Sequence, residues 1–216
     1  TSGVVTAFTL AAVGSLLFAA QGHTEPPPAA HGHRRGASAI RVRGLRVLFV
    51  VGTAVGAILG ALEIGLVAFA DEVGQRSLSG LLIAGLAAGS MFAGIGWGVV
   101  HWKVRLRHRL VAALVVLTVL TVPLVLVTSY WLMLPLVVVA GIAVSPSLIS
   151  AFTLAEVLVP RSAVTEAFTW IGTALALGVA IGASVAGKIV DTVGANASFL
   201  VATVAAGLAA VVVALW

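Results

Sequence analysis

The chain has 216 residues, of which 61% are hydrophobic and only 9% are charged. A water-soluble domain carries about 25% charged residues, so this composition excludes a soluble protein and predicts an integral membrane protein. The chain has no cysteine, which excludes disulfides, thiolate metal sites and a cysteine nucleophile. The net charge of +5 does not predict nucleic-acid binding, because the basic residues lie in connections between apolar runs, where they orient membrane helices.

Seven apolar segments, each long enough to cross a bilayer, follow one another along the chain. Only helices and closed barrels satisfy the backbone in lipid, and long continuous apolar runs indicate helices rather than barrel strands. The sequence therefore predicts an all-α, polytopic membrane protein with seven transmembrane helices. The predicted spans are 3–20, 47–70, 77–100, 110–128, 131–158, 164–190 and 197–216.

The first connection, residues 21–46, is much longer than the others and contains Pro26–Pro28 and five arginines. Nothing in it can bury a core, so it is predicted to be a basic, flexible linker. Its His23, His31 and His33 could bind a metal, but a solvated linker gives them no fixed geometry, and no metal site is predicted.

Lysine and arginine are distributed unequally between the two sides of the predicted membrane. Alternate connections hold ten of the twelve, and the positive-inside rule places those connections in the cytoplasm. This arrangement predicts that Thr1 starts outside and Trp216 ends inside. The ten arginines and two lysines are also typical of GC-rich bacteria, which suggests a bacterial inner membrane. The third connection supplies four basic residues, predicted to determine topology at a cytoplasmic gate: Lys103, Arg105, Arg107 and Arg109.

Glycines recur every fourth residue in the second span, at Gly52, Gly56 and Gly60. Such a repeat forms a narrow groove that lets the backbone of another helix approach closely. Gly178 and Gly182 form a second site of this kind. Both are predicted to be helix-packing sites.

Glu63 is the one acid deep within a predicted span. It lies about 20° around the helix from Gly52, so it is predicted to share the glycine face and to point at protein. An ionised acid at a helix centre costs about 2.5–3.5 kcal/mol, and somewhat less at this depth, unless a partner, a water-filled cavity or protonation offsets it. We predict a proton-coupling or cationic-substrate site, with Thr53 on the same pathway. The alternative is a neutral acid bonded to a neighbouring helix.

A serine-proline patch interrupts the fifth span, where Pro146 lies between Ser145 and Ser147, with Ser150 one turn further on. Proline frees a backbone carbonyl and bends a helix, and hydroxyl groups can satisfy the freed carbonyl. The patch is therefore either a polar wall of a substrate cavity or a local repair of the bend.

One span, a long basic linker and six further spans resemble the major facilitator superfamily, as the last helix of the first half followed by the complete second half. The resemblance implies that 1–20 belongs to the preceding half and that 47–216 is a six-helix half-domain. The run from Gly187 through Asp191 to Gly194 is similar to the family's G-x-L-x-D-R-x-G signature, with Thr192 in place of arginine.

The resemblance implies secondary active transport of a small solute by alternating access. The first and fourth helices of the half, 47–70 and 131–158, would then line the pathway. The implied partners are the lipid bilayer, the missing N-terminal half, a small-molecule substrate and protons, with no cofactor. Efflux of a drug or metabolite is slightly favoured over uptake.

A seven-helix receptor-like protein and a structural membrane protein are the competing interpretations. The last span has no lysine for a retinal Schiff base. A membrane enzyme is not predicted, because the spans contain no serine-histidine-acid set and no metal-ligand spacing.

Overall fold

The computed structural model describes residues 2–20, 39–100 and 102–216, which form helices and short turns. The chain divides into two compact units, Thr1–Gly36 and Ala37–Trp216. In the first unit, α1 (Ser2–Ala19) is an apolar helix, and its part Phe8–Ala19 is shorter than the spans of the second unit. Its role as a seventh transmembrane helix stays a prediction.

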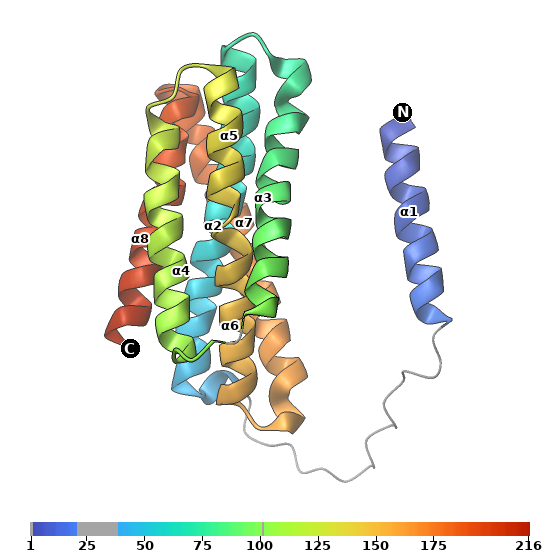
Figure 1. Cartoon of the computed structure of the whole chain (residues 1–216), viewed down its shortest axis with the longest axis vertical. Coiled ribbons are helices and arrows are strands. Elements are labelled where there is room, and N and C mark those ends of the chain that lie inside the picture. Colours follow the sequence, from blue (N-terminus) through green and yellow to red (C-terminus); the bar gives the residue numbers. More distant parts are fainter. Residues whose placement is uncertain (1, 21–38, 101) are drawn as a thin grey trace. The chain divides into compact units, whose positions relative to one another are not determined.

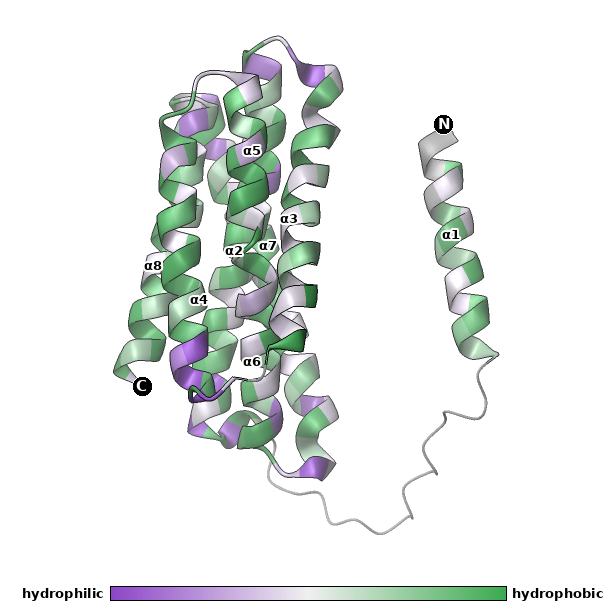
Figure 2. Cartoon of the chain, in the orientation of Figure 1, coloured by the Kyte–Doolittle hydropathy of each residue, from purple (hydrophilic) through white to green (hydrophobic). Residues whose placement is uncertain are grey.

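The second unit is a bundle in which α2 lies at the centre (Figure 1). Within the described residues, six helical stretches are long and apolar enough to cross a membrane, with α5 and α6 counted as one. Apolar residues cover the middle of the bundle, and hydrophilic residues gather at its two ends (Figure 2). The elements are η2 (Ala39–Arg41), α2 (Arg43–Glu72), η3 (Arg76–Leu78), α3 (Ser79–Val99), α4 (Leu106–Thr121), η4 (Val122–Val125), α5 (Tyr130–Gly141), α6 (Val144–Leu158), η5 (Arg161–Ala163), α7 (Val164–Thr192) and α8 (Ala195–Leu215).

Helices α2 and α7 pack backbone against backbone, as the glycine repeats predict. A Cβ on Gly56 would collide with the Leu175 carbonyl group and would lie 3.0 Å from the Gly178 Cα. A Cβ on Gly178 would in turn collide with the carbonyl group of Thr53. Only residues without side chains allow this approach. The five predicted packing glycines are all buried: Gly52, Gly56, Gly60, Gly178 and Gly182.

A second contact of the same kind, which is not among the predicted packing sites, joins α3 to α5. A Cβ on Gly89 would collide with the Val138 carbonyl group, and one on Gly141 with that of Leu86. Gly85 and Gly89 are four residues apart on α3, which is the signal that could have indicated this site.

The fifth predicted span is two helices, α5 and α6, separated at Ile142 and Ala143. Pro146 has no N–H group to donate to the Ile142 carbonyl, and it lies in the first turn of α6, where a helix does not need that bond. The Ser147 hydroxyl donates to the neighbouring Ala143 carbonyl at 2.8 Å, within the first turn of α6. The predicted bend is therefore a break within one membrane span.

The linker ends earlier than predicted, because α2 begins at Arg43 rather than at residue 47. Ala39 and Leu45 are buried, and the Ala39 N–H donates to Glu166 Oε1 at 3.0 Å. This contact ties the start of the second unit to α7. The linker histidines lie outside the described residues.

We expect Gly178→Ala to lower the unfolding temperature of the chain in detergent. The added Cβ must push α2 and α7 apart, and overpacking of this kind costs about 1–3 kcal/mol. Gly172→Ala is the matched control on the same helix, since its Cβ would meet nothing within 4 Å. Equal unfolding temperatures for the two variants would contradict the backbone contact.

Candidate functional site

Glu63 lies on the surface of the bundle, with no hydrogen bond or ion pair to another of the described residues. It is nine residues before Glu72, the last residue of α2, and therefore about 14 Å from that end. The expectation that it packs with the glycine face is wrong for this bundle. Beyond Gly60 the buried side of α2 turns from α7 to α8, because Gly65 packs against Ser198 and Phe199. This change of partner leaves the carboxylate uncovered.

Thr53 makes a local contact on α2, and its place on the transport pathway stays a prediction. Its hydroxyl donates to the Phe49 carbonyl one turn earlier, at 3.0 Å, and its own carbonyl lies against Gly178. The residue is half-buried. It therefore supports the packing of α2 on α7.

The three serines of the patch have different roles. The Ser147 hydroxyl bonds within its own helix, to the Ala143 carbonyl. The Ser145 hydroxyl lies 2.7 Å from that of Ser90 and joins α6 to α3. Ser150 is buried, and its hydroxyl has no hydrogen-bond partner in the part of the chain that the structure describes. A role of the patch as a polar wall of a substrate cavity stays a prediction.

The structure does not bring Glu63 and Ser150 together. Leu62, the residue before Glu63, packs in a core cluster that also contains residues of α5. Ser150 precedes Ala151, which packs in a separate cluster with Val55. The acid and the unpaired hydroxyl therefore lie at different depths along the bundle.

The four basic residues of the third connection, Lys103, Arg105, Arg107 and Arg109, form a basic run at one end of the bundle. Two of the four have structural partners. Arg107 donates from Nε to the Val213 carbonyl at 3.0 Å and from its terminal nitrogen to the Ala214 carbonyl at 2.6 Å. It therefore caps the C-terminal end of α8, where a cation is favoured. The guanidinium carbon of Arg109 lies 5.0 Å from the Trp102 ring centroid and 5.6 Å from that of Trp97, within cation–π range.

Lys103 and Arg105, the other two members of the run, are exposed. Their role in topology or gating stays a prediction.

The sequence profile of the Major Facilitator Superfamily matches residues 47–216, which cover all six spans of the bundle. The chain belongs to the major facilitator superfamily. Members of this family are membrane transporters rather than enzymes, and the six apolar helices fit the C-terminal half of the family's fold. Comparison with curated proteins and with solved structures found no match.

The superfamily-like signature lies at the turn from α7 to α8. Gly194 has a φ of 119°, a conformation that only glycine adopts readily, so its identity has a local structural reason. Asp191 is exposed. A Cβ on Gly187 would meet nothing within 4 Å, so packing does not require a glycine there.

We expect Arg107→Gln to destabilise this superfamily member by about 1 kcal/mol, because it removes a cation from a helix C-terminus and weakens two hydrogen bonds. Lys103→Gln is the control, since Lys103 is an exposed cation of the same connection. Thermal unfolding in detergent measures both. The capping role fails if the two variants unfold at the same temperature.

Proposed function

We propose that residues 47–216 form the C-terminal half of a secondary transporter that moves a small solute by alternating access. Transporters of this kind rock two bundles about a site near the middle of the membrane. The family match over all six spans supports this assignment. Residues 1–20 would be the last helix of the preceding half, and 21–38 the linker between the halves.

The position of Glu63 carries the proposal. Its neighbours on the same exposed surface of α2, Ile64 and Val67, are apolar. If this surface faced lipid, an ionised carboxylate would cost up to about 2.5–3.5 kcal/mol. A water-filled space between two halves removes most of that cost. We therefore place this face of α2 against the N-terminal half, with Glu63 on the pathway.

The counter-charge for Glu63 must come from outside this half. Among the described residues, the deepest cations lie near helix ends: Lys188 is four residues from the end of α7, and Arg109 is in the first turn of α4. A proton, a cationic substrate or a residue of the other half can take that position. An unpaired acid on an apolar wall suits an amphipathic cation, which favours efflux of drug-like compounds over sugar uptake.

The same position of Glu63 supports the proposal of proton coupling. When the water-filled space between the two halves opens to one side of the membrane, water reaches Glu63 and a proton can bind to the carboxylate or leave it. When this space opens to the other side, Glu63 exchanges its proton with the opposite compartment. Substrate movement is coupled to the proton gradient if substrate and proton compete for this carboxylate.

We expect Glu63→Gln to abolish proton-driven accumulation or efflux by the full-length transporter in proteoliposomes, while energy-independent exchange persists. Glutamine keeps the shape and hydrogen bonding of the side chain but cannot titrate. Glu156→Gln is the control, because Glu156 is an exposed acid near the end of α6. Transport by the Glu63→Gln variant with the pH dependence of the unmodified protein would eliminate the coupling role.

The topology is a separate proposal. Since ten of twelve basic side chains lie on alternate connections, we expect Arg105 to face the cytoplasm and Gly74 to face outward. Reporter fusions at the two positions, each active on one side of the membrane only, measure this directly. An outward signal at Arg105 would refute the orientation.

A further inference from the structure

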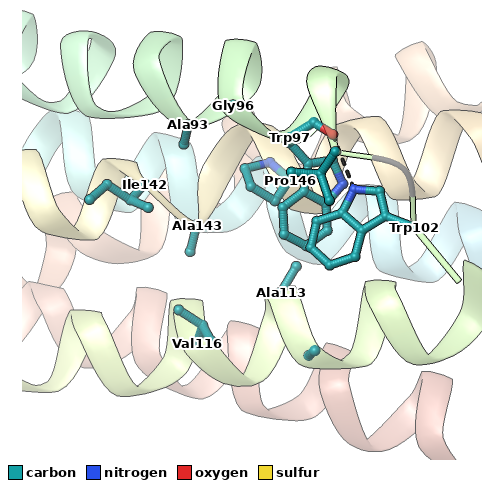
Figure 3. Close-up of a pocket in the computed structure, with 11 residues that line it drawn as sticks. Ala93, Gly96, Trp97, Trp102, Ala113, Val116, Ile142, Ala143 and Pro146 are labelled. Carbon is teal, nitrogen blue, oxygen red and sulfur yellow. Dashed lines mark hydrogen bonds between the residues drawn. The ribbon is translucent and has the colours of Figure 1, made fainter. Parts of the chain in front are cut away.

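Helices α3 and α4 and the α5–α6 junction enclose an apolar cavity of about 590 Å³ (Figure 3). Small residues widen it, among them Ala93 and Gly96 on α3, and a Cβ on Gly96 would meet nothing within 4 Å. The large apolar residues Val100, Val116 and Ile142 of the lining are exposed, with exposed fractions between 45% and 50%. The cavity therefore opens sideways onto the apolar surface of the bundle.

An apolar molecule that fills a cavity of this kind makes favourable dispersion contacts with the side chains around it. Side chains around an empty apolar space lose dispersion contacts that a well-packed interior provides, and apolar cavities in proteins bind apolar molecules rather than water. In a membrane, the apolar molecules beside such an opening are hydrocarbon chains. The apolar lining therefore suits the acyl chain of a lipid.

The end of the cavity nearest the basic run has polar groups that suit a head group. The rings of Trp97 and Trp102 lie 4.0 Å apart, and Trp102 Nε1 donates to the Trp97 carbonyl at 3.1 Å (Figure 3). Arg109 stacks on both rings. In the described part of the chain, Trp97 Nε1 and Arg109 Nε are buried without hydrogen-bond partners. Two N–H donors, one of them cationic, therefore lack an acceptor beside the apolar cavity.

Buried donors without partners are rare, because each one costs free energy unless an acceptor satisfies it. Residues 102–109 contain four lysines and arginines and no acid, so this end of the bundle attracts anions. Lys103 and Arg105 are exposed and follow closely in the chain after Trp102, which lines the cavity. An anchoring role for the tryptophans at the interface explains neither the empty volume nor the unpaired donors.

We propose that this cavity is a binding site for one anionic phospholipid. An acyl chain fills the apolar space between α3, α4 and the α5–α6 junction. The phosphate binds at the Arg109 guanidinium beside the two tryptophans, and Lys103 and Arg105 add charge around it. The site is distinct from the proposed transport pathway, since neither Glu63 nor Ser150 lines the cavity.

Native mass spectrometry of the purified full chain tests the proposal. The protein is offered equimolar dioleoylphosphatidylglycerol and dioleoylphosphatidylcholine in detergent, and the retained lipid is counted. We expect roughly fivefold preference for the anionic lipid, the effect of about one basic residue at an anionic surface. Arg109→Gln should reduce the ratio to about one. Equal retention of the two lipids by the unmodified protein would overturn the site.

A variant that keeps every charge separates the cavity from simple attraction to the basic run. Gly96→Leu places a side chain in the empty space and should remove the retained anionic lipid. Gly80→Leu is the matched control, because Gly80 also lies on α3 with nothing within 4 Å of its Cβ but does not line the cavity. The proposal is wrong if Gly96→Leu retains anionic lipid as well as Gly80→Leu does.

Discussion

The contact of α2 with α7 is the constraint on which the rest of the bundle depends. Lipid tails are as apolar as leucine, so the hydrophobic effect does not hold membrane helices together, and close backbone packing must do so. Gly178 lies against the Thr53 carbonyl and Gly56 against that of Leu175. This fit fixes the rotation of α2 about its axis. Because the buried side of α2 then turns to α8 at Gly65, Glu63 is left on the outer surface, where a transport pathway can use it.

Most charged side chains whose contacts are seen tie helix ends together. Glu72 accepts a hydrogen bond from the Ala195 N–H at 2.8 Å, at the N-terminus of α8, while Arg107 caps the other end of the same helix. Each places the sign of charge that the helix dipole favours at that terminus. Glu63 performs no such task among the described residues, and a costly charge without a structural role is a functional candidate in a membrane protein.

Much of the fold could be predicted because membrane helices follow from local composition. Apolar runs located the six spans, and the spacing of Gly52, Gly56 and Gly60 identified a real contact. The exposure of Glu63 could not be predicted, because a helical wheel gives an angle on α2 but not the neighbour that occupies it at each depth. The Arg107 cap joins residues more than 100 positions apart, and no local pattern indicates it. The partners of Ser145 and Ser147 could not be predicted either, since sequence alone does not say which group each hydroxyl reaches.

The break between α5 and α6 connects the two proposals physically. Ala143 and Pro146 line the lipid cavity on one side of this span, while Ala143 and Val144 also pack in the core cluster of α2. A broken helix loses hydrogen bonds at the break and bends there more easily than a continuous one. Whatever fills the cavity therefore contacts the break in a span that we propose to line the pathway. An acyl chain in the cavity would favour the helix geometry that leaves room for it. Bilayer composition would then influence transport through this junction without contacting Glu63.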